Sequence, residues 1–129
     1  MSSSSAPESD IDIKVTTQYL KQQSDPARSS YAFAYTITIT NLREHPVRLL
    51  SRHWIITDQN GSIDEVKGSG VVGQQPLIAP GKSYQYSSGT VITTETGDMQ
   101  GSYTMEGSDG EQFQAAIPMF ILAVPHMVH

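Results

Sequence analysis

A glycine-rich segment contains a pattern that binds phosphate groups in other folds. The stretch from Lys67 to Gly73 reads K-G-S-G-V-V-G and contains the pattern G-x-G-x-x-G. In a dinucleotide-binding fold this pattern joins a strand to a helix whose N-terminus holds pyrophosphate. Here Gln-Gln-Pro follows and no helical periodicity begins, so that interpretation fails.

Two interpretations of the glycine-rich segment remain open. Successive backbone N–H groups can bind an anion without any helix, and a lysine beside them adds positive charge. Alternatively, the three glycines only shape a bulged loop and let backbones pack closely. The first interpretation gives a candidate nucleotide or pyrophosphate site at Lys67, Gly68, Ser69, Gly70 and Gly73.

Charged side chains are distributed unevenly along the chain. Between residues 43 and 54 Glu44 is the only acidic residue among five basic or imidazole side chains, and between residues 95 and 111 there are five carboxylates and no lysine or arginine. Such a pattern can steer a protein partner, or the two segments can pair across neighbouring strands. As the candidate partner surface we take Arg43, Arg48, Arg52 and His53.

The residue types needed for catalysis or metal binding form no coherent set. Cysteine is absent, which removes thiol nucleophiles, disulfides and cysteine-based zinc sites. The segment Asp58–Gly61 resembles a calcium loop only faintly, because its glycine comes two positions too early for an EF-hand. An H-x-x-H motif occupies residues 126–129, at the C-terminus. We predict no enzyme activity, no cofactor and no metal site, although Asp58, Asp64 and a histidine can still assemble in space.

The elements that must position these residues are β-strands. Apolar and polar residues alternate in Ile11–Tyr19 and in Tyr31–Thr40, the period expected when successive side chains point to opposite faces of a sheet. Asn-Gly within Asp58–Ser62 predicts a hairpin turn, after which Ile63–Val66 returns as a short strand. The alternation changes phase near Leu49–Leu50 and again near Pro118, which predicts a β-bulge at the first and a bulge or sheet edge at the second.

Together these signals predict an all-β fold. About seven or eight strands with frequent turn signals are typical of an antiparallel β-sandwich, immunoglobulin-like or fibronectin type III-like. Trp54, the only tryptophan, is predicted to fill the core. We expect one domain over residues 11–124, with a disordered N-terminal tail at 1–10 and a flexible C-terminal tail at 125–129.

Composition narrows the classes of function and location. The net charge of −5 argues against broad nucleic-acid binding. No stretch approaches the ~20 apolar residues of a membrane span, and no apolar signal region begins the chain. The absence of cysteine fits a reducing cytosol. We therefore expect a cytoplasmic protein without membrane or nucleic-acid partners.

Several motifs in the same order resemble the ApaG family. They are R-x-W-x-I-T-D at Arg52–Asp58, V-x-G-x-G-V-V-G at Val66–Gly73, Y-x-S-G at Tyr86–Gly89 and G-x-M-x-G-x-Y-x-M at Gly97–Met105. The resemblance extends over nearly all of residues 11–122. It implies a small, usually cytoplasmic, bacterial β-sandwich that is similar to fibronectin type III domains, and it brings no catalytic residues.

The resemblance also implies what such a protein does. Related domains occur in eukaryotic F-box proteins and in a polymerase-delta-interacting protein, where protein binding is the expected role. The family is associated with cobalt and magnesium efflux and with dinucleoside polyphosphate metabolism. We therefore predict a non-catalytic protein-interaction module, monomeric or weakly homo-oligomeric, with an indirect link to cation efflux. The alternative is nucleotide or pyrophosphate binding through residues 67–73.

Overall fold

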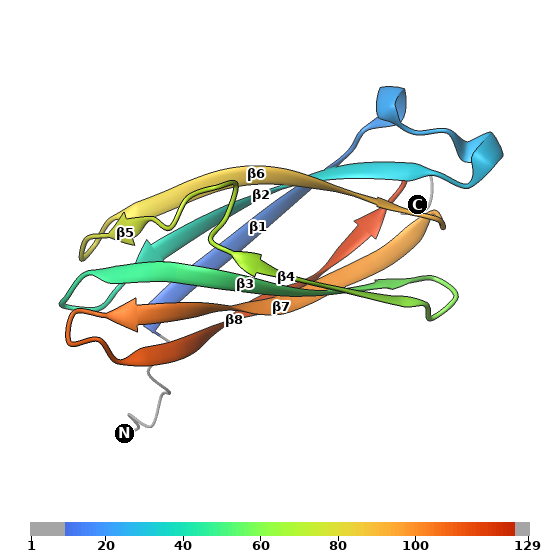
Figure 1. Ribbon diagram of the computed structural model, residues 1–129. Helices are drawn as coiled ribbons and strands as arrows, with labels where there is room; N and C mark the ends of the chain where they lie inside the picture. The colour runs from blue at the N-terminus through green and yellow to red at the C-terminus, as the bar shows by residue number, and fades with distance from the viewer. Residues whose placement is uncertain (1–9, 126–129) are drawn as a thin grey trace, which may run out of the picture.

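Eight strands in two antiparallel sheets make up the described part of the chain, residues 10–125 of a computed structural model (Figure 1). Two single-turn 3-10 helices, Lys21–Gln23 and Pro26–Arg28, lie between the first two strands. The strands are β1 (Ile11–Tyr19), β2 (Tyr31–Asn41), β3 (Val47–Asp58), β4 (Ile63–Ser69), β5 (Leu77–Ile78), β6 (Ser83–Ile92), β7 (Thr96–Gly107) and β8 (Gln112–Ala123).

The strands form a sandwich with one closed side and one open side. The first sheet has the order β1-β2-β6; the second has the order β4-β3-β7-β8, with the short β5 also paired to β3. β1 and β8, at one border of each sheet, pack against each other. β6 and β4 are therefore the borders at the other side. The predicted all-β antiparallel sandwich is confirmed.

The core lies between the two sheets and is built by the inward-facing residues of the alternating strands. Trp54 is 2% exposed and lies at its centre, as predicted. Its ring packs edge-on against Tyr35 and Phe120, with ring centroids 5.4 and 5.8 Å apart. Aromatic rings in this geometry stabilise a core beyond the area they bury. β3, which carries Trp54, is thus fixed firmly in the molecule.

The predicted irregularities occur where the phase of the sequence changes. The register between β3 and β7 shifts between Leu49 and Ser51, which confirms the predicted β-bulge. The register between β7 and β8 shifts opposite Pro118, and β8 is a sheet edge. The Asn-Gly hairpin also forms, because the Asp58 N–H donates to the Ser62 carbonyl at 3.0 Å. Beyond the bulge, the alternation of side chains places Arg52 and Trp54 on the inner face of β3 and His53 on the outer face.

One predicted boundary is wrong. The sequence suggested a short strand at residues 63–66 followed by a glycine-rich loop, but β4 continues to Ser69 and pairs with β3 as far as Ser51. Gly68 does not end the strand, since its φ angle is not positive; the first glycine of the segment with a positive φ is Gly70.

Some predictions fall on residues that the structure does not describe. The tails predicted at 1–10 and 125–129 lie outside the described residues except for Asp10 and Pro125, and so do both histidines of the H-x-x-H motif. Among the described residues, no helix is long and apolar enough to cross a membrane.

Candidate functional site

The open side of the sandwich exposes both faces of one strand. β4 pairs with β3 along one border, and among the described residues no strand pairs with its other border, which we call the β4 edge. Every side chain of β4 is exposed or half-buried, including Val66 on the inner face, which is 40% exposed. The three-stranded sheet therefore does not cover β4 as it covers β3 and β7.

A polar pocket of about 330 Å³ opens beside β4, and we call it the Arg52 pocket. Its walls come from β3, β6 and the connection between β4 and β5, which Figure 1 shows beside β6. Its floor includes the inner aromatic side chains. The lining residues are Tyr35, Arg52, Trp54, Ser69, Val71, Val72, Gly73, Tyr86, Ser87 and Ser88.

Arg52 is held in this pocket by the backbone of the following connection. Its Nη1 donates hydrogen bonds to the carbonyl oxygens of Ser69 and Gly70, each at 3.0 Å. The guanidinium lies over Gly68, directly opposite Arg52 in the β3–β4 register. A Cβ at position 68 would lie 2.8 Å from three guanidinium atoms. Gly68 therefore leaves room for the guanidinium, which a side chain at this position would displace, and its backbone angle is not unusual.

Two tyrosine hydroxyls lie next to each other here: Tyr86 lines the pocket, and Tyr103 lies behind it in the core. The hydroxyls of Tyr86 and Tyr103 are hydrogen-bonded at 2.5 Å, and Tyr103 is fully buried. Burial raises the pKa of Tyr86, although its hydrogen bond with Tyr103 partly opposes this. Burial and the neighbouring Tyr86 raise the pKa of Tyr103. Both hydroxyls therefore stay protonated at neutral pH, so the pocket holds one guanidinium beside neutral hydroxyl groups and suits an anionic group.

The structure divides the predicted anion site between two pockets: Lys67, Gly68 and Ser69 line one on the outer face, and Ser69 and Gly73 line the Arg52 pocket. Lys67 lies on the outer face of the sheet, 3.9 Å from Glu65, while Gly73 lines the Arg52 pocket on the inner side. The N–H of Gly70 donates to Leu50 and that of Val71 donates to Gln74, so both amides are used within the chain. Arg52, and not Lys67, is therefore the cation beside the turn formed by residues 71–74.

The turn that contains Gly73 is tight and strained. Val71 and Gln74 exchange two backbone hydrogen bonds, and the two residues between them have positive φ angles. Gly73, at 76°, adopts this conformation easily, but Val72, at 48°, is β-branched and disfavours it. The Val72 side chain is 62% exposed, so little packing compensates for the strain.

The four residues of the predicted partner surface do not form one surface. Arg48 donates from Nη1 to the Gln75 carbonyl at 2.7 Å. His53 is hydrogen-bonded to Glu65 on the outer face, and Arg52 lies on the inner face. Arg43 lies in a separate pocket at the end of the sandwich. Arg52 lines the inner pocket next to the β4 edge, whereas His53 lines a second pocket of about 460 Å³ on the outer face beside the same strand.

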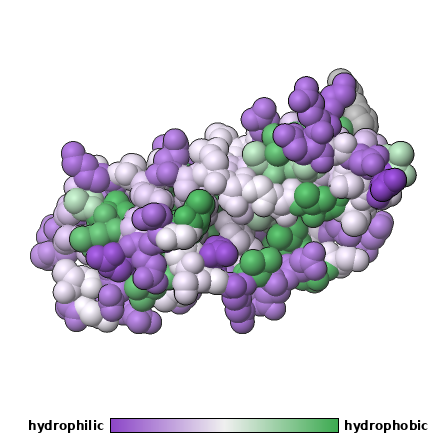
Figure 2. All heavy atoms as spheres, turned by 45° about the horizontal axis from the view of Figure 1, so that its top comes forward, coloured by the Kyte–Doolittle hydropathy of each residue, from purple (hydrophilic) through white to green (hydrophobic). Residues whose placement is uncertain are grey.

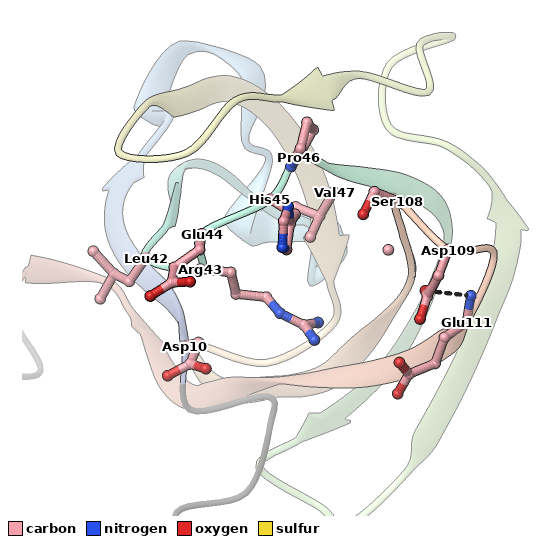
Figure 3. A pocket seen from close by; sticks show the side chains of 11 residues that line it. Asp10, Leu42, Arg43, Glu44, His45, Pro46, Val47, Ser108, Asp109 and Glu111 are labelled. Atoms are coloured by element: carbon pink, nitrogen blue, oxygen red, sulfur yellow. Dashed lines mark hydrogen bonds between the residues drawn. The ribbon is translucent and has the colours of Figure 1, made fainter.

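The pocket around Arg43 is larger but lined by turns. Its volume is about 570 Å³, and it lies between the β2–β3 and β7–β8 turns. Figure 3 shows the Arg43 side chain crossing its middle, with Asp109 and Glu111 on the opposite wall. The guanidinium carbon lies 4.2 Å from the centre of the Phe113 ring, and the buried Nη1 has no hydrogen-bond partner. Four carboxylates surround this pocket, so a ligand anion meets repulsion there: Asp10, Glu44, Asp109 and Glu111.

Of the side chains considered for a spatial metal site, Asp58 is engaged in its own turn. Asp58 Oδ1 accepts hydrogen bonds from the N–H groups of Asn60 and Ser62, which shapes the hairpin turn. Within residues 10–125, histidine and acidic side chains nowhere assemble in a group of three or more suited to a metal ion.

Sequence reasoning missed the β6 part of the site. Ser88 lies opposite Tyr35 and faces inward, in a series of alternate residues that is otherwise aromatic, β-branched or apolar. A polar residue at an inward position was the signal available.

Figure 2 shows that apolar side chains form several separate groups on the face it displays, without one continuous patch.

Comparison with known proteins gives one consistent result. Residues 21–107 match the family model described as the ApaG domain. The chain is 57% identical over 125 residues to Protein ApaG of Pseudomonas fluorescens, covering 97% of this chain and 99% of that one. It is 58% identical over 119 residues to Protein ApaG of Pseudomonas aeruginosa, covering 92% and 94%.

Two solved structures have the same fold. The X-ray structure of a Northeast Structural Genomics Consortium target superposes with a TM-score of 0.91 at 50% identity, covering 96% of this chain and 94% of that chain. A crystal structure of an ApaA protein from Bordetella pertussis superposes with a TM-score of 0.87 at 48% identity, covering 90% and 94%.

Proposed function

This chain belongs to the ApaG domain family, and we propose that it is a non-catalytic module that binds an extended, acidic segment of a partner protein. The segment adds to the β4 edge and places a carboxylate in the Arg52 pocket. The observation that carries the proposal is a guanidinium in an open polar pocket directly beside an unpaired strand edge.

The β4 edge supplies the backbone part of the recognition. The Asp58 N–H donates to Ser62 and the Gly70 N–H donates to Leu50, at the two ends of the β3–β4 ladder. Antiparallel ladders alternate, so the even-numbered residues of β4 direct their N–H and C=O groups toward β3. The N–H and C=O groups of Ile63, Glu65, Lys67 and Ser69 point away from β3. An extended peptide can pair with these groups by strand addition.

Arg52 supplies the selectivity for an acidic side chain. Its Nη1 is already bonded to two carbonyl oxygens, which fixes the guanidinium in place before any partner arrives. A preorganised guanidinium binds a carboxylate with less entropic cost than a mobile one. The hydroxyl of Ser88, on the inner face of β6, provides a further donor in the same pocket.

The proposal is tested by following backbone amide shifts during titration with two short capped peptides. Val-Asp-Val-Asp-Val should shift the amides of residues 63–69 at about 1 mM, a concentration that detects binding of only ~4 kcal/mol. Val-Lys-Val-Lys-Val should not. Arg52→Met should abolish the effect, and Arg52→Lys should weaken it. Arg48→Met is the matched control, because Arg48 is on the same strand and also donates to a backbone carbonyl, yet lies outside the pocket.

The proposal is contradicted if a folded Arg52→Met variant binds the acidic peptide as well as the unmodified chain does. The absence of shifts with either peptide contradicts it as well.

A second candidate, nucleotide binding, is favoured by one observation. The backbone of the Val71–Gln74 turn and the Arg52 guanidinium line the same pocket, so a phosphate group meets a cation and a turn together. Titration with ATP and with diadenosine tetraphosphate distinguishes this candidate. Shifts confined to residues 70–73, without any response to the acidic peptide, would favour the nucleotide.

A further inference from the structure

We propose that a second copy of this chain is one partner of the β4 edge, and this inference rests on the proposed function. The two β4 strands pair antiparallel about a two-fold axis that passes between the two copies of Val66. The pairing joins the two β3-containing sheets into one continuous sheet. A two-fold interface requires the same strand to be complementary to itself, and β4 meets this requirement in its backbone and in its charges.

The backbone of β4 allows only some registers. Ile63, Glu65, Lys67 and Ser69 direct their N–H and C=O groups to the free edge, as the bonds at the ends of the β3–β4 ladder require. In a self-paired edge, these odd-numbered residues must therefore lie opposite odd-numbered residues of the partner subunit. A register shift by one residue would place them opposite even-numbered residues, whose N–H and C=O groups are already bonded to β3, so the groups at the free edge would stay unpaired.

Charge selects one register among those that remain. With the axis at Val66, Glu65 lies opposite Lys67 of the partner subunit, and Lys67 lies opposite the partner's Glu65. A shift of two residues in one direction places the two copies of Glu65 opposite each other. The same shift in the other direction does so for Lys67. Opposite charges across a strand pair stabilise it and like charges destabilise it. The register centred on Val66 also pairs all seven residues of β4.

The inner face provides a second complementary contact in the same register. Asp64 of the partner subunit lies opposite Gly68, in a pair whose Cα atoms are ~4.5 Å apart in antiparallel sheets. The space over Gly68 is filled by the Arg52 guanidinium. The carboxylate of the partner's Asp64 thus reaches the cation that we assign to acidic segments. The two half-exposed copies of Val66 meet at the axis and cover each other.

A charge-swap experiment tests the register in solution. Sedimentation equilibrium at low ionic strength should detect dimers of the full chain at ~0.1–1 mM. Lys67→Glu should weaken the dimer by ~10-fold or more, and Glu65→Lys should do the same, because each makes both cross-strand pairs repulsive. An equimolar mixture of the two variants should dimerise again, because the two negative charges of one variant then lie opposite the two positive charges of the other.

The closed side of the sandwich supplies the matched control. Asp12 and Lys14 also lie two residues apart on a border strand, β1, with their charged groups 3.9 Å apart. Lys14→Glu and Asp12→Lys should leave the dimer unchanged. A purely local role for Glu65 and Lys67 predicts no recovery on mixing, and that result overturns the inference.

A cross-linking experiment places the axis. The chain contains no cysteine, so each single-cysteine variant reports on one position. Val66→Cys should form a disulfide-linked dimer under mild oxidation, because residues facing each other across the axis lie within disulfide reach. Ile63→Cys is on the same strand and 64% exposed, yet lies opposite the partner's Ser69 and should remain a monomer.

The two proposals fail in different ways. A chain that stays monomeric at 1 mM but binds Val-Asp-Val-Asp-Val overturns the second-copy inference and leaves the proposed function standing. A chain that neither dimerises nor binds this peptide overturns both. Equal cross-linking at positions 63 and 66 overturns the register.

Discussion

Replacing Gly68 with alanine should displace Arg52 from the backbone that holds it. The new Cβ would lie 2.8 Å from the guanidinium, which must move and thereby loses its hydrogen bonds to Ser69 and Gly70. Hydrogen bonds to a charged group contribute ~1.5–3 kcal/mol each when buried. Because water reaches both carbonyl groups, the combined loss should be about 1–2 kcal/mol. Alanine in a strand is favoured over glycine by ~0.5–1 kcal/mol, so the net destabilisation should be only about 0.5–1 kcal/mol.

A double-mutant cycle measures the coupling directly. Urea unfolding of the unmodified chain, Gly68→Ala, Arg52→Ala and the double variant gives four free energies of unfolding. In the Arg52→Ala background there is no guanidinium to displace, so Gly68→Ala should stabilise the chain by ~0.5 kcal/mol. The expected coupling is about 1–2 kcal/mol, well above the ~0.3–0.5 kcal/mol scatter of independent sites. A coupling within that scatter would show that Arg52 does not depend on the space above Gly68.

Two further predictions concern the turn and the buried tyrosines. Val72→Asn should raise the urea midpoint by the equivalent of ~1 kcal/mol, because asparagine tolerates the positive φ angle that strains a β-branched residue. A lower midpoint would mean that the Val72 side chain makes stabilising contacts. The raised pKa values of Tyr86 and Tyr103 mean that the folded state keeps protons that the unfolded state loses above pH ~10. The free energy of unfolding should therefore be unaffected by these groups below pH ~10 and should fall by up to ~1.4 kcal/mol per pH unit for each tyrosine above it. The variant Tyr86→Phe/Tyr103→Phe should have a flatter alkaline profile in unfolding titrations; an unchanged slope contradicts the assignment.

Much of the fold was predictable because its signals are local. Alternation in Ile11–Tyr19 and Tyr31–Thr40 reports which face of each strand is buried, and Asn-Gly specifies a hairpin through the backbone angles it permits. The bulge at Leu49–Leu50 was also predictable, since a change of phase forces an extra residue into one strand. These features depend on near neighbours in the chain.

The candidate site was predicted only in part because it depends on distant contacts. The sequence alone includes Arg52, Gly68 and Gly73 among the members of two separate candidate sites, and it places Trp54 in the core. Only the tertiary structure decides that Lys67 and Gly73 lie on opposite sides of the sheet, since β4 continues through residues that resemble a loop. Only the packing of the two sheets brings Ser88 of β6 into the same pocket as Arg52 and leaves the β4 edge uncovered. Local chemistry specifies the strands, whereas which of their borders stays open is a property of the whole sandwich.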